Sequence, residues 1–360
     1  MARYILGIDT VYHSSGVGLI DENGKVIINK KKDIDFTNEN AQEFYNFLIK
    51  NTLSSIKPIL DEYAEDIFLI SVSCEEGMFH SMPVGAIIAN SISYFFDKQV
   101  VGVSHEMAHM HANWLDRKDD DIKFPAICLS ISGGHSDIYL LRSHCDIEKM
   151  ADIFWTEKQD RFGGLGALFY EVCYLMNMKV KKGQGGQLLE SLAQLGEPRY
   201  AEELGDIEMK KEEKNYFFRN IKLHILEKLK SLQYYSLDMN SEEAEIFRRD
   251  FASSFLQVLF DFLVLAVAQA AEESGSKEIH LAGGAAVNDL LKLKIENYCK
   301  ESSLNFKVPV EKEYCGDNGS MAAISGYFKW KYSNLDPEEK FLTIKPTSWY
   351  YKYYASHYDK

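Results

Sequence analysis

Two histidines four residues apart, His105 and His109, are the residues of this sequence that most directly suggest chemistry. They lie in the stretch HEMAH, which has the H-E-x-x-H form of zinc proteases, where a helix carries two metal ligands and a general base. At this spacing two imidazoles on a helix face the same way and can hold one metal ion. The alternative is that hydrogen bonds at a helix start satisfy both rings. The pair therefore predicts a metal site or a structural histidine pair.

The residues around the pair argue against a peptidase. Zinc proteases carry H-E-x-x-H inside a long helix and place a third ligand downstream. Here the preceding VVGVS is a strand-like run, so His105 falls at a strand end or in the first turn of a helix. The following HMHANWLDRKDDD offers only His111 and an acidic cluster. We therefore expect a chemistry other than peptide hydrolysis.

The composition is that of an acidic protein of ordinary hydrophobicity. The chain has 360 residues, 46% of them hydrophobic, and a formal net charge of −14. Phosphate binding needs clustered Lys and Arg, so this charge argues against a broad nucleic-acid-binding face. It leaves room for a local basic patch or for tRNA delivered by a partner. The six cysteines are scattered without a C-x-x-C pair, which indicates reduced thiols in a cytoplasmic protein.

We expect neither a signal peptide nor a membrane span. The N-terminal MARYILGIDT has a strand-like run where a signal peptide would need a long apolar segment. The most apolar stretch, residues 255–271, is interrupted by Gln257, Asp261 and Gln269, which favours a buried core helix.

Two stretches of the sequence, one before and one after the histidines, share a single pattern. YILGIDTVYHSSGVGLID and AICLSISGGHSDIYLL each consist of an apolar run, a turn rich in Ser and Gly, and a second apolar run, which predicts a β-hairpin. Amides in such turns can approach a phosphate closely. Each stretch alone is compatible with a plain hairpin, but their repetition predicts two related α/β lobes. The charged stretch from Ile207 to Asn215 predicts a solvated helix face.

Six motifs follow one another along nearly the whole chain, and their order carries a family resemblance. They are ILGIDT with SGVGLI, MPVGAIIANSISYFFDKQVVGVSHEMAH, FPAICLSISGGHSDIYLL, GGQLLESLAQLG, HLAGGAAVNDLLKLKI and YCGDNGSMAA. In these motifs the chain resembles the bacterial TsaD, or glycoprotease-like, threonylcarbamoyltransferases, which make threonylcarbamoyladenosine in tRNA. The resemblance implies an α/β fold of the two-lobed actin-like type, shared with sugar kinases and Hsp70, with duplicated lobes and mixed sheets.

The same resemblance implies the domain organisation. We expect an N-terminal actin-like lobe at residues 1–122 and a C-terminal lobe at 123–316 with a helical insertion at about 197–250. Residues 317–360 would form a helix that returns toward the first lobe and then an aromatic tail.

For the metal site, the resemblance implies that Asp317 completes the ligand set of His105 and His109. Two imidazole nitrogens and one carboxylate suit Zn²⁺ or Fe²⁺, with Mg²⁺ as a further alternative. The ion would act as a Lewis acid and as a template. Asp317 also precedes NGSMAA, where it would fit as a helix N-cap, and both roles are compatible.

For the nucleotide, an adenylate or ATP-type ligand, the resemblance implies three groups of contacts. Those near the metal-bound phosphate are Ile131, Ser132, Gly133, Gly134 and His135. Those on the ribose side are Gly186 and Glu190, and those around the adenylate are Gly283, Gly284 and Asn288. The implied reaction is attack by an amine on the carbamoyl carbon of a carbamoyl-adenylate, with loss of AMP. It needs neutralised charge on the leaving phosphate and a base for the amine proton.

The chain departs from the family pattern at two places. The acidic first turn of the family is replaced by His13, Ser14 and Ser15, so that His13 becomes a hypothetical substitute base, with Ser14 beside it. Tyr170 stands where a family aspartate touches the substrate. Both departures resemble the small-molecule O-carbamoyltransferases, which carry similar segments and normally continue into an adenylate-forming domain.

Three functions are therefore compatible with the sequence. The first is a TsaD-like transfer to tRNA, with the adenylate made by a separate protein and with partners similar to TsaB and TsaE. The second is O-carbamoyl transfer to a sugar or natural product. The third is a non-catalytic scaffold that has lost its carboxylates.

Overall fold

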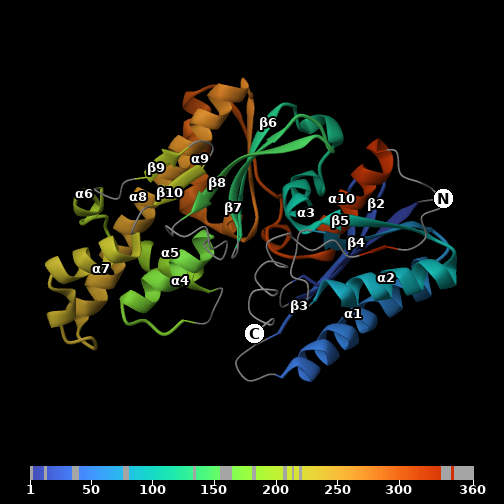
Figure 1. Ribbon diagram of the computed structural model, residues 1–360, viewed down its shortest axis with the longest axis horizontal. Helices are drawn as coiled ribbons and strands as arrows, with labels where there is room; N and C mark the ends of the chain where they lie inside the picture. Colours follow the sequence, from blue (N-terminus) through green and yellow to red (C-terminus); the bar gives the residue numbers. More distant parts are fainter. Residues whose placement is uncertain are drawn as a thin grey trace, which may run out of the picture. The chain divides into compact units, whose positions relative to one another are not determined.

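The computed structural model divides the chain into two compact units (Figure 1). Unit 1 consists of Met1–Ile122, Ser143–Asp146 and Pro309–Lys360. Unit 2 consists of Lys123–Arg142 and Ile147–Val308. The structure describes residues 3–11, 14–34, 40–75, 81–132, 135–154, 164–180, 184–205, 209–212, 215–218, 221–333 and 342–343. The chain thus leaves unit 1, forms unit 2 and returns at Pro309, eight residues before Asp317.

Unit 1 contains a five-stranded mixed sheet in the order β3-β2-β1-β4-β5. Its strands are β1 (Tyr4–Asp9), β2 (Ser14–Asp21), β3 (Val26–Asp33), β4 (Ile67–Glu75) and β5 (Gln99–Ser104). The first three are antiparallel, which confirms the predicted opening hairpin, whereas β1, β4 and β5 are parallel.

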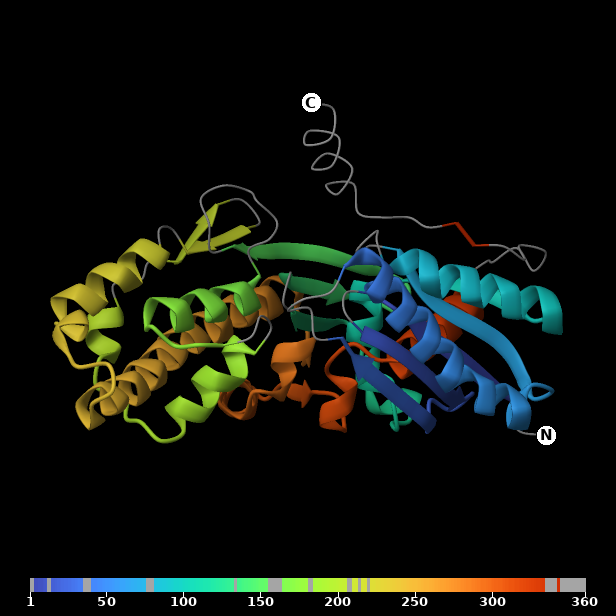
Figure 2. The same cartoon turned by 90° about the horizontal axis from the view of Figure 1, so that it is seen from below.

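Helices cover both faces of this sheet. They are α1 (Ala41–Tyr63), α2 (Met82–Phe96), α3 (His105–His111) and α10 (Gly319–Tyr332), with 3-10 turns η1 (Ala112–Trp114), η2 (Asp119–Asp121) and η5 (Lys312–Tyr314). Helices α1 and α2 lie side by side (Figures 1 and 2) and share one hydrophobic core with the strands, formed by residues such as Leu48, Ile59, Ile88, Leu6 and Ile8.

Helix α10 packs on the opposite face of the sheet, where glycines of β1 and β2 present no side chain. Gly7 of β1 is paired with Gly18 of β2. A Cβ at Gly7 would lie 2.0 Å from the carbonyl oxygen of Gly319, and one at Gly18 would lie 2.3 Å from the amide nitrogen of Ser320. Because alternate residues of a strand share a face, these glycines open a single surface on which the first turn of α10 rests.

The parallel strands of unit 1 place their last residues at one edge of the sheet. Strand β1 ends at Asp9, β4 ends at Glu75, and β5 ends at Ser104, directly before α3. In open α/β sheets this carboxyl edge is where ligands bind, because loops and helix starts meet there. The fold therefore brings the first histidine of HEMAH to the position expected of a site.

Unit 2 contains a seven-stranded mixed sheet in the order β12-β11-β6-β7-β8-β10-β9. Its strands are β6 (Ala126–Ile131), β7 (Ser136–Leu141), β8 (Ile147–Phe154), β9 (Met209–Glu212), β10 (Asn215–Phe218), β11 (Glu278–Ala282) and β12 (Asn305–Lys307). Strands β6 and β7 form the second predicted hairpin, and β11 runs parallel to β6.

The helices of unit 2 are built around one long apolar helix, α8. They are α4 (Leu165–Leu175), α5 (Gly185–Ala193), α6 (Ala201–Leu204), α7 (Ile221–Ser231), α8 (Glu242–Ser274) and α9 (Asp289–Glu301), with 3-10 turns η3 (Tyr234–Ser236) and η4 (Gly284–Val287). Helix α8 is the one helix of the described residues that is long and apolar enough to cross a membrane, but 61% of its most apolar window is buried. Core helices of soluble proteins pass the same test.

One local prediction is wrong. The stretch 207–215 was expected to be a solvated helix face, but Met209–Glu212 is strand β9, which pairs antiparallel with β10. Strand β10 in turn adds to β8 at Tyr216 and Phe217. The open edge of β8 supplies backbone hydrogen bonds that local helix propensity, a weak preference, does not outweigh.

Candidate metal centre

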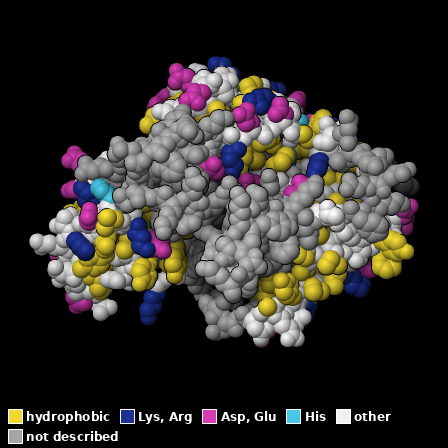
Figure 3. All heavy atoms as spheres, in the orientation of Figure 1, with side chains coloured by type: hydrophobic (Ala, Val, Ile, Leu, Met, Phe, Trp, Pro, Cys, Tyr) yellow, Lys and Arg dark blue, Asp and Glu magenta, His cyan; other side chains and the backbone are white. Residues whose placement is uncertain are grey.

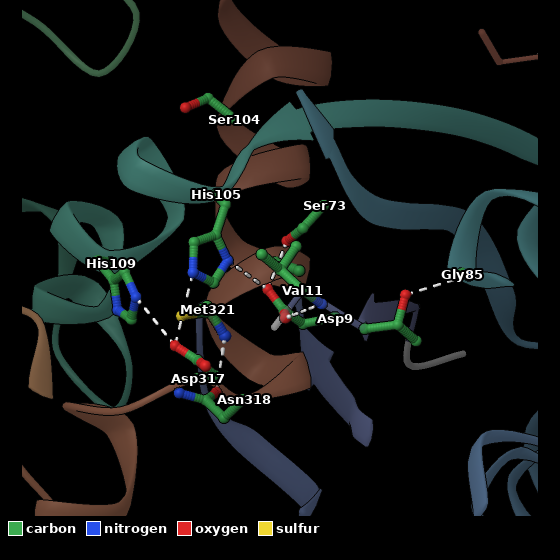
Figure 4. A network of polar contacts seen from close by, with 12 residues as sticks. Asp9, Val11, Ser73, Gly85, Ser104, His105, His109, Asp317, Asn318 and Met321 are labelled. Carbon is green, nitrogen blue, oxygen red and sulfur yellow. Dashed lines mark hydrogen bonds and ion pairs between the residues drawn. The ribbon is translucent and has the colours of Figure 1, made fainter. Parts of the chain in front are cut away.

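The two histidines of HEMAH begin a short helix at the carboxyl end of β5. Ser104 ends the strand in an extended conformation and caps α3, its hydroxyl accepting a hydrogen bond from the amide of Met107. His105 is thus the first residue of the helix, as the sequence predicts. One turn later His109 lies beside it, with the ring centroids 4.7 Å apart and the planes at 75°. Both imidazoles project on the same side of α3 (Figure 4).

Asp317 meets both rings from a segment distant in sequence. Its Oδ1 lies 3.2 Å from Nε2 of His109 and 3.5 Å from Nε2 of His105. Each of the three residues offers a ligand atom, and these atoms lie within 4.8 Å of one another. The side chains of His105 and His109 are 11% and 3% exposed, and that of Asp317 is 26% exposed. The cluster is therefore buried but reachable from solvent through the carboxylate.

The capping role considered for Asp317 belongs to its neighbour. Asn318 is the N-cap of α10, and its Oδ1 accepts the amide hydrogen of Met321. Its Nδ2 donates to the carbonyl oxygens of Tyr314 and Gly316. Asn318 thereby ties the preceding loop to the helix start. Asp317 is left outside the cap, with its carboxylate directed at the histidines (Figure 4).

A second carboxylate, Asp9, lies behind His105. Its Oδ2 is 2.9 Å from Nδ1 of His105 and also accepts a hydrogen bond from the hydroxyl of Ser73 at 2.7 Å. Its Oδ1 accepts the amide hydrogen of Val11 at 3.0 Å. Asp9 is completely buried. The imidazole of His105 therefore stands between two carboxylates, one facing each ring nitrogen (Figure 4).

The electrostatics of the cluster follow from this arrangement. Burial disfavours a charged ring at His105, but the adjacent carboxylates of Asp9 and Asp317 outweigh it and raise the pKa of His105 well above its usual value. Burial likewise disfavours a charged carboxylate at Asp317, yet the close contacts with His105 and His109 hold the pKa of Asp317 well below its usual value. The cluster thus keeps an anionic carboxylate beside two imidazoles.

These donors fit a divalent metal ion. Among the described residues, neither ring nitrogen of His109 has a hydrogen-bond partner, although both are buried. The atom of this ring that faces the carboxylate is Nε2, at 3.2 Å from Oδ1 of Asp317. A buried polar atom without a partner is costly in a folded protein, and a cation at the trio would satisfy it. Two imidazoles and one carboxylate suit Zn²⁺ or Fe²⁺.

Comparison with known proteins assigns the chain to a family. The family model described as "TsaD: tRNA N6-adenosine threonylcarbamoyltransferase" matches residues 46–324, more than half of the chain. The chain belongs to the TsaD family. A tRNA N6-adenosine threonylcarbamoyltransferase of Carboxydothermus hydrogenoformans is 28% identical over 93% of this chain and 96% of its own length. One of Staphylococcus haemolyticus is 23% identical over 94% and 98%.

Solved structures confirm the predicted fold class. Full-length HypF superposes with a TM-score of 0.62 at 14% identity, over 93% of this chain, which spans 56% of the HypF chain. HypF of T. kodakarensis gives a TM-score of 0.54 at 14% identity, and this chain spans 50% of it. At this identity the likeness establishes the fold alone, an α/β fold of the actin-like type with two mixed sheets.

The departures from the TsaD pattern are only partly described. Ser14 begins β2, and its buried hydroxyl has no hydrogen-bond partner within the described part of the chain. The neighbouring Ser15 instead contacts Thr52 of α1 at 2.8 Å. His13 lies outside the described residues, as do Gly133 and Gly134. Of the two described residues of this altered turn, Ser14 and Ser15, only Ser14 has a hydroxyl for which the described residues provide no hydrogen bond.

In unit 2 the structure brings the first predicted phosphate turn next to the second. The turn after β6 is closed by Ser132, whose amide donates to the carbonyl oxygen of His135 and whose hydroxyl accepts the amide hydrogen of His135. Gly283, at φ +81°, packs so closely on Ile131 that a Cβ would lie 2.4 Å from the Ile131 carbonyl oxygen. Next to it, Gly284 faces open space.

The other predicted nucleotide residues of unit 2 hold helix starts in place. Asn288 is the N-cap of α9, and the carboxylate of Glu190 accepts the amide hydrogen of the next residue, Asp289, at 2.7 Å. Gly186 packs on the ring of Phe169 in α4. Its neighbour Tyr170 is half-buried in the same helix. Each of these contacts has a structural role, and their contact with a nucleotide stays a prediction.

Sequence reasoning missed the residues behind the ligands. Asp9, Ser73 and Asn318 were assigned no role from the sequence. One signal was present, because YILGID ends an apolar run with a carboxylate directly before a polar turn. A charged residue at the carboxyl end of a buried strand is a candidate site residue.

Proposed function

We propose that this chain transfers a threonylcarbamoyl group from threonylcarbamoyl-adenylate to the adenosine next to the anticodon of tRNA. The observation that carries the proposal is the convergence of His105, His109 and Asp317 within 4.8 Å in a member of the TsaD family. The relatives named above are all tRNA N6-adenosine threonylcarbamoyltransferases. They favour tRNA over a sugar acceptor or a scaffold role.

The reaction is an acyl transfer from a mixed anhydride. The exocyclic amine of the adenosine attacks the carbamoyl carbon, the bond from that carbon to the phosphate oxygen breaks, and AMP leaves. The amine proton passes to a base. Because negative charge develops on the leaving phosphate, fixed cationic or N–H groups beside it lower the barrier.

The residues of unit 1 would hold one divalent ion. A bound Zn²⁺ or Fe²⁺ ligated by His105, His109 and Asp317 would supply a Lewis acid and a template. We propose that Ser14, whose buried hydroxyl has no partner among the residues that the structure describes, binds the substrate. His13 is proposed as the base for the amine proton.

The residues of unit 2 would hold the nucleotide. We propose that the amides of the turn from Ile131 to His135 and those of Gly283 and Gly284 bind phosphate and adenosine. The open space around Gly284 and the tight Ser132 turn support this role, since exposed amides at a turn can form a nest for anions. Tyr170 would contact the ligand in place of the family aspartate.

We propose a cytoplasmic location, a separate protein that makes the adenylate, and pathway partners similar to TsaB and TsaE. All six cysteines are free thiols, in keeping with a reducing compartment. Figure 3 shows hydrophobic side chains gathered over α1 and α2. The exposed large hydrophobic residues of these two helices are Tyr45, Ile49 and Leu53 of α1 and Ile87, Tyr94, Phe95 and Phe96 of α2. An apolar patch of this kind marks a protein-binding surface, and we assign it to a partner.

The test is transfer in vitro from synthetic threonylcarbamoyl-adenylate, with and without an adenylate-forming partner protein. Acceptors are unmodified tRNA and a panel of sugars, and products are separated as nucleosides. We expect modified adenosine from tRNA, and a loss of more than about a hundredfold in His109→Gln. The matched control is His111→Gln, on the same helix but outside the trio. Transfer to sugars instead of tRNA, or full activity of His109→Gln, would contradict the proposal.

A further inference from the structure

We propose that Asp9 is the positioning residue of the metal centre, holding His105 in the tautomer and orientation that turn its Nε2 toward the ion. The inference rests on the proposed function, because it requires that the trio binds a metal. The inference gives the two carboxylates of the cluster different roles. Asp317 is a ligand, whereas Asp9 acts through the imidazole of His105.

The contacts of Asp9 leave its carboxylate no freedom. Oδ2 receives the hydroxyl of Ser73 and faces Nδ1 of His105, while Oδ1 receives the amide hydrogen of Val11. The three contacts come from β4, from α3 and from the residue two positions beyond Asp9 itself. The side chain is completely buried, so these oxygens are shielded from bulk solvent. The carboxylate therefore has one rotamer and one direction in which to accept a proton donor from His105.

This geometry decides which nitrogen of His105 faces the ion. A carboxylate only accepts hydrogen bonds, so a neutral imidazole beside Asp9 must carry its proton on Nδ1. The lone pair is then on Nε2, the atom that lies 3.5 Å from Oδ1 of Asp317. Asp9 is itself no ligand, because the imidazole of His105 stands between it and Asp317 (Figure 4). Outer-shell carboxylates of this kind orient metal-binding histidines and raise their basicity.

The second histidine lacks such support. Among the described residues, Nδ1 of His109 has no hydrogen-bond partner, and the polar contact given for this ring is that of Nε2 with Asp317. If one imidazole is oriented only by its surroundings, the precision of the site depends more strongly on the other. Asp9 is thus the residue through which the sheet controls the metal ligands.

Replacing Asp9 by asparagine tests this role without changing the volume. The amide has one acceptor and one donor end. With its NH₂ at the Oδ2 position, it donates toward Nδ1 and drives the His105 proton to Nε2, which removes the ligand lone pair. With its NH₂ at the Oδ1 position, it meets the amide hydrogen of Val11. Either orientation opposes the arrangement that binds metal.

The experiment measures metal binding of the full chain, without any substrate. Zn²⁺ and Co²⁺ affinities are determined by competition with a chromophoric chelator for wild type, Asp9→Asn, Ser73→Ala and Ser71→Ala. We expect Asp9→Asn to weaken binding about tenfold to a hundredfold, and Ser73→Ala to weaken it by a smaller factor. Ser71 is the matched control, because it lies on the same strand but donates to the Ala322 carbonyl oxygen, so its variant should bind metal as wild type does.

Two further readouts separate positioning from stability. Nitrogen NMR of zinc-loaded protein should show a protonated Nδ1 at His105 in wild type. The visible spectrum of bound Co²⁺ should change in Asp9→Asn and stay unchanged in Ser71→Ala. Unchanged metal affinity in both Asp9→Asn and Ser73→Ala would overturn the role of Asp9 while leaving the metal centre intact. If wild type itself binds neither ion, the proposed metal centre fails, and this inference with it. Should Asp9→Asn not fold, Ser73→Ala against Ser71→Ala decides.

Discussion

At the scale of single residues, Asp317 contacts both histidines of the cluster but caps no helix. Asn318 caps α10 and ties the loop, whereas Asp317 contacts only the two histidines among the interactions described for it. We therefore predict that Asp317→Ala reduces metal content from about one ion per chain to near zero. The free energy of unfolding of chelated protein should fall by no more than about 3 kcal/mol, because Asp9 still faces His105. Elemental analysis beside a melting curve measures both quantities, and unchanged metal content would count against the site.

A second residue-scale prediction concerns acid stability. His111 is buried, with Nε2 at 2.9 Å from the His144 carbonyl oxygen and Nδ1 at 3.0 Å from the Ser325 hydroxyl. Burial lowers the pKa of His111 from 6.5 to about 3, although the hydrogen bond to the carbonyl oxygen opposes this. Between pH 6.5 and about 3, His111 is therefore protonated in the unfolded chain but stays neutral in the folded chain. The folded state loses stability as pH falls from 6.5 toward 3.

The size of this effect follows from linkage. The His111 contribution is about 1.4 kcal/mol of lost stability for each pH unit below 6.5. His111→Gln keeps a donor and an acceptor but does not titrate, so its stability should fall less steeply with acid than that of wild type. Urea unfolding in a chelator at pH 7.5 and 5 measures the difference. Equal pH dependence in the two proteins would show that His111 does not hold its neutral form.

The sequence predicts the site residues unequally. The spacing of His105 and His109 is local and can be read directly, and Asp317 came from a family pattern. Asp9 was missed because its contact with His105 spans 96 residues and depends on the pairing of β1 with β4. The N-cap was placed one residue early, because Asp and Asn are equally good caps and only the loop geometry distinguishes them.

At the scale of elements, the contact of α10 with β1 and β2 determines where Asp317 lies. Gly7→Ala would place a Cβ 2.0 Å from the Gly319 carbonyl oxygen and 2.6 Å from the Ala323 amide nitrogen, both backbone atoms. Because a backbone atom cannot move aside alone, α10 must shift. We predict a loss of at least about 3 kcal/mol in the free energy of unfolding, together with weaker zinc binding. Chemical denaturation and zinc titration measure the two effects.

The control for this prediction is Gly284→Ala in unit 2. A Cβ there meets nothing within 4 Å, so stability and zinc affinity should stay near those of wild type. If Gly7→Ala behaved like this control, the close packing of α10 on the sheet would be wrong, and with it the route by which the fold positions Asp317.

Elements that rest on local patterns were predicted well. Both hairpins have Ser and Gly between apolar runs, and both occur as expected. The charged stretch that became β9 shows the limit, because its structure comes from pairing with β10 and β8, which no local pattern contains. Propensity indicated a helix, and the open sheet edge decided otherwise.

At the scale of the whole molecule, the repeated hairpin was the most informative feature of the sequence. It predicted two α/β parts, and the structure shows two units, each with a mixed sheet and its own helices. The likeness to HypF agrees with that fold. The net charge of −14 was less informative, because it describes the surface and not the cluster where the chemistry takes place.

Anomalous diffraction at the absorption edge of the bound metal, on crystals of the purified chain, tests the central claim most directly. We predict a single strong peak bounded by Nε2 of His105, Nε2 of His109 and Oδ1 of Asp317, with Nδ1 of His105 turned to Asp9. A peak elsewhere, or none at these three atoms in protein supplied with Zn²⁺ or Fe²⁺, would contradict it.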